Sequence, residues 1–283
     1  MSRLSPPPAG RRPAARRPRI LSTLLAAGLA LTLLGPPGTA GASAAPAAAP
    51  EPRVVYGANY GAVADESRYQ RRPNAARIYY RQRIPADLTK TGPFSRPYND
   101  GVRTFLISWK DENRDRVRTA LRSLPDNVTV YGTYFHEPED DIARGDLTLA
   151  AWTRDTNAQA KIMRRQDIIP TTILMAFTVV GGKGRDVSDY YDANVAVFGF
   201  DYYPDKIKQS PRTVINQMAA ASRASGSGRL VIGEFGVPTG SADGPALTRQ
   251  AKRAFRDVGV EVACYWSQSK YALNAQLTRI WFE

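Results

Sequence analysis

The chain of 283 residues has one cysteine and one histidine, and this scarcity excludes several kinds of site. A single cysteine excludes an internal disulfide. Because Cys264 lies in the apolar run Val262-Ala-Cys-Tyr-Trp266, we expect a buried, unreactive thiol rather than a nucleophile. Because His136 is the sole histidine, a Cys-His or zinc site would need carboxylates as its other ligands.

Acidic residues are missing from the first part of the chain, where residues 1–44 carry six arginines and no acid. This positive region precedes the apolar stretch Ile20 to Leu34 and the small-residue run Ala42-Ser43-Ala44. That order is typical of a secretory signal peptide, and the apolar stretch is short for a membrane span. We therefore expect a secreted, extracellular protein cleaved near Ala44, without stable membrane association afterwards.

The sequence also lacks a dense basic run. Removing residues 1–44 takes away six basic groups and no acidic ones, which lowers the formal net charge from +13 to +7. The other arginines are scattered among acids, so we expect no nucleic-acid partner. The pairs Arg11-Arg12 and Arg16-Arg17 leave Sec and twin-arginine export open. Residues 45–53 are rich in Ala and Pro and indicate a linker, followed by one domain over residues 54–283.

Eight apolar segments predict eight strands in that domain, with helices between them. Near-continuous apolar runs are typical of parallel strands covered on both faces, and the count and length favour a (β/α)8 TIM barrel of the α/β class. The alternative is an open, doubly wound α/β sheet. The expected strands are Val54–Asn59, Ala76–Tyr80, Thr104–Trp109, Val128–Phe135, Ile168–Phe177, Val195–Tyr202, Leu230–Phe235 and Val262–Trp266.

The expected helices are marked by caps and apolar periodicity. Asp146 is a candidate cap, Ser210-Pro211 begins another helix, and Gly244 to Val258 ends at Gly259. In the first half, Asp111 to Leu124 has helical periodicity. The Pro- and Gly-rich segment between Tyr80 and Thr104 predicts a loop in place of a full helix.

Two of the expected strands end in a glutamate. The fourth strand is followed by His136-Glu137-Pro138, and the seventh contains Glu234. In such barrels the active site lies at the carboxyl ends of the strands, and strands four and seven place these two carboxylates across one cleft. A carboxyl pair is the requirement for glycoside hydrolysis.

These motifs resemble the clan A retaining glycoside hydrolases over most of residues 54–268. The resemblance implies that Glu137 is the acid/base and Glu234 the nucleophile. His136 before the acid/base and the run Glu234-Phe235-Gly236 are similar to glycoside hydrolase family 26, the β-mannanases. Lys110, in Ser108-Trp109-Lys110, and the run Pro138-Glu139-Asp140-Asp141 depart from that family's pattern, which leaves the mannan specificity open.

Further residues at the strand ends suit a sugar cleft. Trp109 and Trp266 end the third and eighth strands, where sugar faces stack on such rings. The alternative for each tryptophan is packing in the core. Asp201, Tyr202 and Tyr203 end the sixth strand, where the resemblance implies a tyrosine that binds the nucleophile. Alternation lets one of the two tyrosines point inward, and we take Tyr202 to be that one.

Two basic groups complete the expected site. Arg81 has the same strand parity as Arg77 and Tyr79, so it is a candidate for keeping Glu234 ionised, with a solvent-exposed arginine as the alternative. His136 is expected to orient Glu137 or to contact a sugar hydroxyl.

Together these patterns predict a secreted, monomeric, retaining hydrolase that cleaves β-linked polysaccharide as an endo-acting glycanase, without cofactor or metal. Retention requires carboxyl groups about 5–5.5 Å apart. One alternative is a non-catalytic carbohydrate-binding or cell-wall barrel. Another is a hydrolase that binds metal through Glu139, Asp140 and Asp141.

Overall fold

The structure, a computed structural model, describes residues 53–59, 73–182, 185–192 and 194–283. The expected signal peptide and most of the expected linker lie outside the described residues. Eight parallel strands form a closed barrel in chain order, which confirms the (β/α)8 prediction. The strands are β1 (Val55–Asn59), β2 (Ala75–Tyr80), β3 (Thr104–Trp109), β4 (Thr129–Tyr134), β5 (Ile169–Met175), β6 (Val197–Tyr202), β7 (Leu230–Phe235) and β8 (Val260–Tyr265).

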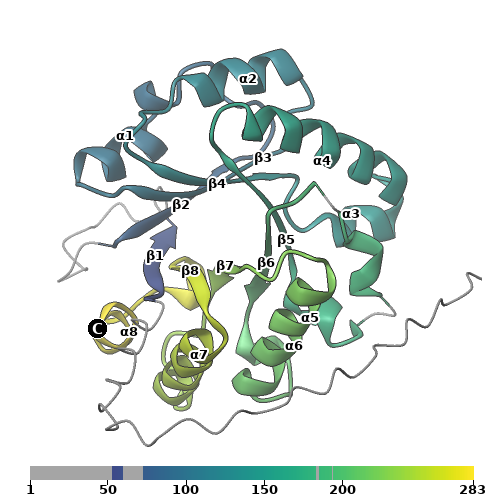
Figure 1. Cartoon of the computed structure of the whole chain (residues 1–283). Helices are drawn as coiled ribbons and strands as arrows, with labels where there is room; N and C mark the ends of the chain where they lie inside the picture. Colours follow the sequence, from purple (N-terminus) through teal and green to yellow (C-terminus); the bar gives the residue numbers. More distant parts are fainter. Residues whose placement is uncertain (1–52, 60–72, 183–184, 193) are drawn as a thin grey trace, which may run out of the picture. The chain divides into compact units, whose positions relative to one another are not determined.

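Helices surround the strands, as Figure 1 shows. No helix in the described part of the chain is long and apolar enough to cross a membrane. The helices are α1 (Gly92–Asn99), α2 (Arg114–Arg122), α3 (Pro138–Arg144), α4 (Leu149–Arg164), α5 (Ala176–Val179), α6 (Pro211–Ala224), α7 (Gly244–Val258) and α8 (Ala275–Phe282), with short 3-10 turns η2 (Leu88–Lys90), η4 (Val187–Tyr190), η5 (Pro204–Lys206) and η6 (Ser269–Tyr271).

Strand alternation divides the core into an inner and an outer layer. Inward-facing side chains from different strands fill the barrel interior, and outward-facing ones pack beneath the helices. The inner cluster consists of Ala75, Leu106, Tyr131, Val197, Val231, Val262 and Cys264. Burial raises the pKa of the Cys264 thiol to about 12, so the group stays protonated, as expected of an unreactive thiol.

Several helix boundaries agree with the sequence prediction, whereas α2 begins at Arg114 rather than Asp111 and two further expectations differ from the structure. Ser210 caps α6 through the Thr213 N–H, and Gly259 ends α7 in the left-handed conformation. The cap of α4 is Thr148 rather than Asp146, because its side chain accepts the Ala151 N–H. The expected loop before β3 contains α1, where buried Phe94 stacks on Phe105 with ring centres 4.6 Å apart. This burial offsets the low helix propensity of the Gly- and Pro-rich segment.

Candidate active site

The chain leaves β4 in an unusual backbone conformation. Phe135 and Glu137 have φ angles of 51° and 50°, in the left-handed region that residues with a side chain rarely occupy. Each such residue costs about 1–3 kcal/mol, and this kind of strain gathers at functional sites. The Glu137 N–H donates to the Ile173 carbonyl oxygen at 2.9 Å, which fixes the turn. The alternation of β4 ends here, and His136 and Glu137 both line one cavity.

That cavity has a volume of about 960 Å³ and opens at the carboxyl ends of the strands. Glu137, from the end of β4, and Glu234, from β7, both lie in its wall. The structure thus brings the two predicted catalytic carboxyl groups together. The other predicted residues in the wall are Arg81, His136, Asp201, Tyr203 and Trp266.

Glu234 is the carboxylate with the more polar surroundings. The Tyr79 hydroxyl donates to its Oε1 atom at 2.6 Å, and the Tyr203 hydroxyl donates to Oε2. Its side chain is buried. Hydrogen bonds from two phenols fix the carboxylate in one orientation.

Arg77 supplies a buried positive charge beside Glu234. Its side chain is fully buried, and its guanidinium donates to the Ser108 hydroxyl at 2.5 Å and lies 4.1 Å from the centre of the Tyr79 ring. Its charge interacts favourably with Glu234 and Asp201. A buried cation needs a negative partner, so Arg77, rather than the expected Arg81, is the cation set beneath the nucleophile candidate.

Glu137 has the opposite electrostatic environment. Burial raises its pKa to about 8, and the negative charges of Glu234 and Glu139 add to this effect, while Arg77 and Lys206 oppose it. At neutral pH the group therefore carries its proton. A protonated carboxyl facing a hydrogen-bonded carboxylate matches the division into acid and nucleophile.

Asp201 adds a third carboxyl group to the cavity. It is 3% exposed, and neither of its side-chain oxygens has a hydrogen-bond partner among the described residues. Burial raises its pKa well above the usual range, and Glu234 and Glu137 push it in the same direction. The neighbouring Gly233 makes room for it, because a Cβ atom there would collide with Oδ1 of Asp201. Burial thus favours the protonated form of Asp201, whose oxygens have hydrogen-bonding capacity to offer a ligand.

His136 is also held neutral. Burial lowers its pKa well below the usual range, and the charges of Arg77, Lys110 and Arg81 lower it further. Its ring lies 5.1 Å from the Tyr79 ring, centre to centre. A neutral imidazole beside Glu137 suits hydrogen bonding, and its role in orienting the acid stays a prediction.

The acidic run after Glu137 is the first turn of α3, and its three carboxylates have separate partners. Glu139 is buried and accepts hydrogen bonds from the Met175 N–H and the Thr178 hydroxyl, both at 2.8 Å. Asp140 pairs with Arg185 at 2.7 Å. Asp141 pairs with Lys110 at 3.0 Å. Lys110 and the acidic run, where the sequence departs from the family pattern, therefore make contacts that support the wall of the cavity.

Besides the role expected of Arg81, two sequence predictions about this site are wrong. Tyr202 faces outward, where it is fully buried against Phe235, and the tyrosine that binds Glu234 is Tyr203. Trp109 also faces outward into the core and is fully buried, so it offers no face to a sugar. Both errors concern the phase of strand alternation, because on a barrel strand either face accepts an aromatic side chain.

The sequence patterns did not reveal the roles of Arg77 and Tyr79. Both follow the inward parity of β2 on which the Arg81 prediction rested. On β6, Asp201 and Tyr203 likewise share the inward parity of Val197, while Phe198 and Phe200 pack outward. An acid is more costly than an aromatic on the outer, apolar face, so the position of Asp201 was the signal for Tyr203.

Replacing the Tyr203 hydroxyl tests its role against a matched neighbour. Tyr203→Phe removes one hydrogen bond to a carboxylate, a contribution of about 1.5–3 kcal/mol, so kcat/KM for a β-glycoside should fall roughly 10- to 100-fold. Tyr202→Phe removes a buried hydroxyl without a hydrogen-bond partner among the described residues and should leave kcat/KM unchanged. Equal losses in both variants would contradict the assignment.

Comparisons with solved structures agree with the architecture. A curdlan-specific exo-β-1,3-glucanase of glycoside hydrolase family 128 from Blastomyces gilchristii matches with a TM-score of 0.55 at 10% identity, over 80% of this chain and 96% of that one. A family 26 β-mannanase from Bacteroides ovatus gives 0.54 at 14% identity, over 79% and 82%. An endo-β-1,4-mannanase from Thermotoga petrophila gives 0.53 at 12% identity, over 81% and 75%.

Neither a protein-family model nor a curated protein sequence matches the chain. At identities this low, the structural matches establish shared architecture alone. The chain has the barrel fold that these glycoside hydrolases have, and the fold resemblance expected from its sequence is confirmed.

Proposed function

We propose that this protein is a retaining glycoside hydrolase that cleaves β-linked polysaccharide, with Glu137 as acid/base and Glu234 as nucleophile. The observation that carries the proposal is that two carboxyl groups in one cavity have contrasting surroundings. Burial and negative neighbours keep Glu137 protonated. Tyrosine hydroxyls and the nearby Arg77 surround Glu234. The β-glycan substrates named for the structural neighbours agree with this assignment.

In the first step a Glu234 oxygen attacks the anomeric carbon of the bound sugar. The glycosidic bond breaks, and Glu137 transfers its proton to the departing oxygen. The products are a glycosyl ester on Glu234 and a Glu137 carboxylate. Tyr79 and Tyr203 hold the attacking oxygens in place, which lowers the reorganisation needed to reach the transition state.

In the second step Glu137 acts as a base. It takes a proton from a water molecule, whose oxygen attacks the anomeric carbon and releases the sugar from Glu234. Glu137 is protonated again, and both groups regain their starting states. Two inversions at one carbon give net retention, and no metal or organic cofactor enters either step.

The direct test is a reducing-sugar screen of the whole protein against mannans, β-1,3-glucans, mixed-linkage glucans and xylans. Cleavage whose first product keeps the anomeric configuration of the substrate, as monitored by proton NMR, supports the proposal. Product size separates the endo action that we propose from exo action. Glycan binding with no cleavage in the whole panel would favour the non-catalytic barrel instead, and activity lost on adding a chelator would favour a metal-dependent hydrolase.

The pH dependence of hydrolysis should report the protonation of Glu137. Because the acid form is needed and its pKa is about 8, kcat/KM should be high below that value and fall as the pH rises through it. Glu137→Gln has no proton to lose, so its residual activity on an aryl glycoside with a good leaving group should lack this alkaline limb. An alkaline limb that persists in Glu137→Gln would assign the titration to another group.

We also propose that the protein is exported, cleaved near Ala44 and active as a monomer outside the cell. The positive, acid-free start of the chain and its short apolar stretch support export. N-terminal sequencing of protein from the culture medium and light scattering of the purified product check both points.

A further inference from the structure

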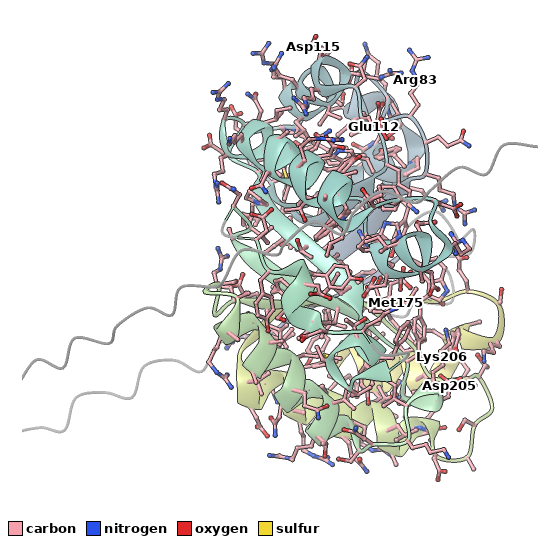
Figure 2. The ribbon with its side chains drawn as sticks, turned by 90° about the vertical axis from the view of Figure 1, so that its right-hand side faces the viewer. Arg83, Glu112, Asp115, Met175, Asp205 and Lys206 are labelled. Atoms are coloured by element: carbon pink, nitrogen blue, oxygen red, sulfur yellow. The ribbon has the colours of Figure 1, made fainter. Side chains whose placement is uncertain are left out.

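Two positive charges in the cavity have no part in the mechanism above. Arg81 follows β2, and Lys206 ends η5; both are exposed and line the cavity. Neither forms an ion pair with a carboxylate among the described residues. The Lys206 ammonium lies over two aromatic faces instead, 4.3 Å from the centre of the Tyr203 ring and 5.9 Å from that of Tyr271. Figure 2 shows Lys206 in the same part of the molecule as Met175, another residue of the cavity wall.

The carboxylates of the cavity do not neutralise these two cations. Asp140 is paired with Arg185 at 2.7 Å. Glu234 faces the buried cation Arg77. Glu137, with its raised pKa of about 8, is mainly protonated at pH 7, and burial raises the pKa of Asp201 in the same direction. Among the described residues of the cavity wall, Arg81 and Lys206 therefore leave an excess of positive charge.

The two cations also lie on opposite sides of the catalytic carboxyl groups. In a closed barrel with strands in chain order, β2 and β6 face one another across the axis. Arg81 follows the first of these strands and Lys206 the second. A polysaccharide chain that crosses the cavity from one side to the other would pass both charges. Positive charge in a concave site raises the local concentration and the affinity of anionic ligands.

We propose that the site binds an acidic β-glycan, in which carboxylate substituents on sugars either side of the cleaved bond contact Arg81 and Lys206. This inference rests on the proposed function and names its substrate class. The planar guanidinium of Arg81 suits a two-point contact with a carboxylate, and the ammonium of Lys206 acts as a point charge. Substrates without charge would leave both cations without a carboxylate partner among the described residues.

Binding to matched polymers tests the proposal without depending on turnover. The probes are oligosaccharides of β-1,4-glucan and β-1,3-glucan, each in unsubstituted and carboxymethylated form, with dissociation constants measured by calorimetry at pH 6.5. We expect at least one carboxymethylated form to bind roughly tenfold or more tightly than its neutral counterpart. The preference should shrink as salt is raised from about 0.01 M to 1 M, because ions screen exposed charges.

Neighbouring residues provide matched controls. Arg81→Gln and Lys206→Gln should each lower the preference for the carboxymethylated form about three- to tenfold. Arg83→Gln and Lys208→Gln remove equivalent exposed charges outside the cavity wall and should leave the preference unchanged. Figure 2 shows Arg83 far from the position of Lys206.

Three results would overturn the inference. The first is equal affinity for the neutral and carboxymethylated forms of each polymer, and the second is an equal change of preference in the cavity and control variants. The third is a loss of affinity in Lys206→Gln that is the same for neutral and charged polymers. The last would mean that Lys206 acts solely on the protonation of Glu137. The proposed function fails separately. Charge-dependent binding with no cleavage of any polymer would remove the hydrolase and keep the acidic ligand, whereas cleavage of neutral polymers without charge preference would do the reverse.

Discussion

Glu234→Ala should abolish hydrolysis of every substrate, because it removes the carboxylate that we propose forms the glycosyl ester. Loss of a nucleophile that acts with its partner as a unit lowers kcat by roughly 10⁴-fold or more. The loss should be independent of the leaving group, since attack on the anomeric carbon precedes all later steps. The measurement is the rate of release of an aryl alcohol from an activated β-glycoside, together with polysaccharide cleavage.

The control for this prediction must separate chemistry from folding. Alanine leaves the Tyr79 and Tyr203 hydroxyls without their acceptor, whereas Glu234→Gln keeps an amide oxygen that accepts one of them. Glu234→Gln should be equally inactive and melt close to the wild-type temperature. Glu112, which Figure 2 labels, is exposed and lies outside the cavity wall, so Glu112→Ala should keep full activity. Substantial turnover by Glu234→Gln would remove the nucleophile assignment.

Glu137→Ala should impair polysaccharide cleavage by about 10²- to 10⁴-fold, the range for loss of a general acid. An aryl glycoside with a good leaving group should react far better, because its oxygen departs without a proton. Hydrolysis of the glycosyl ester then becomes slow, since the base that activates water is gone. A burst of aryl alcohol equal to the enzyme concentration, followed by a slow phase, is the expected time course.

Azide gives a second, independent reading of the Glu137→Ala variant. The anion fits the space that the carboxylate left and attacks the glycosyl ester without needing a base, so it should accelerate turnover. Because it attacks from the face that water normally uses, the glycosyl azide should have the configuration of the substrate. Azide with Glu234→Ala should give the inverted product by a single displacement. Failure of azide to affect either variant would argue against the assigned pair.

The architecture and the two glutamates were predictable from the sequence. Eight apolar segments separated by amphipathic helices gave the strand order, with β3 and β7 at their observed bounds. Buried parallel strands need apolar residues along their whole length, so a carboxylic acid is tolerated where such a strand ends. This cost makes Glu137 and Glu234 visible without a structure, and barrel geometry brings their strands to one cavity.

Which side chains bind and orient these glutamates depends on the tertiary structure. Tyr79 and Glu234 are 155 residues apart, and no local pattern records that their oxygens lie 2.6 Å from one another. Tyr202 and Tyr203 are identical in chemistry, so their roles depend on the phase of β6 within the barrel. The left-handed turn at Phe135 and Glu137 is likewise not predicted by residue propensities, because surrounding contacts compensate for its strain. Local sequence sets the period of a strand, whereas packing against the other strands and the helices sets which side chains face the cavity.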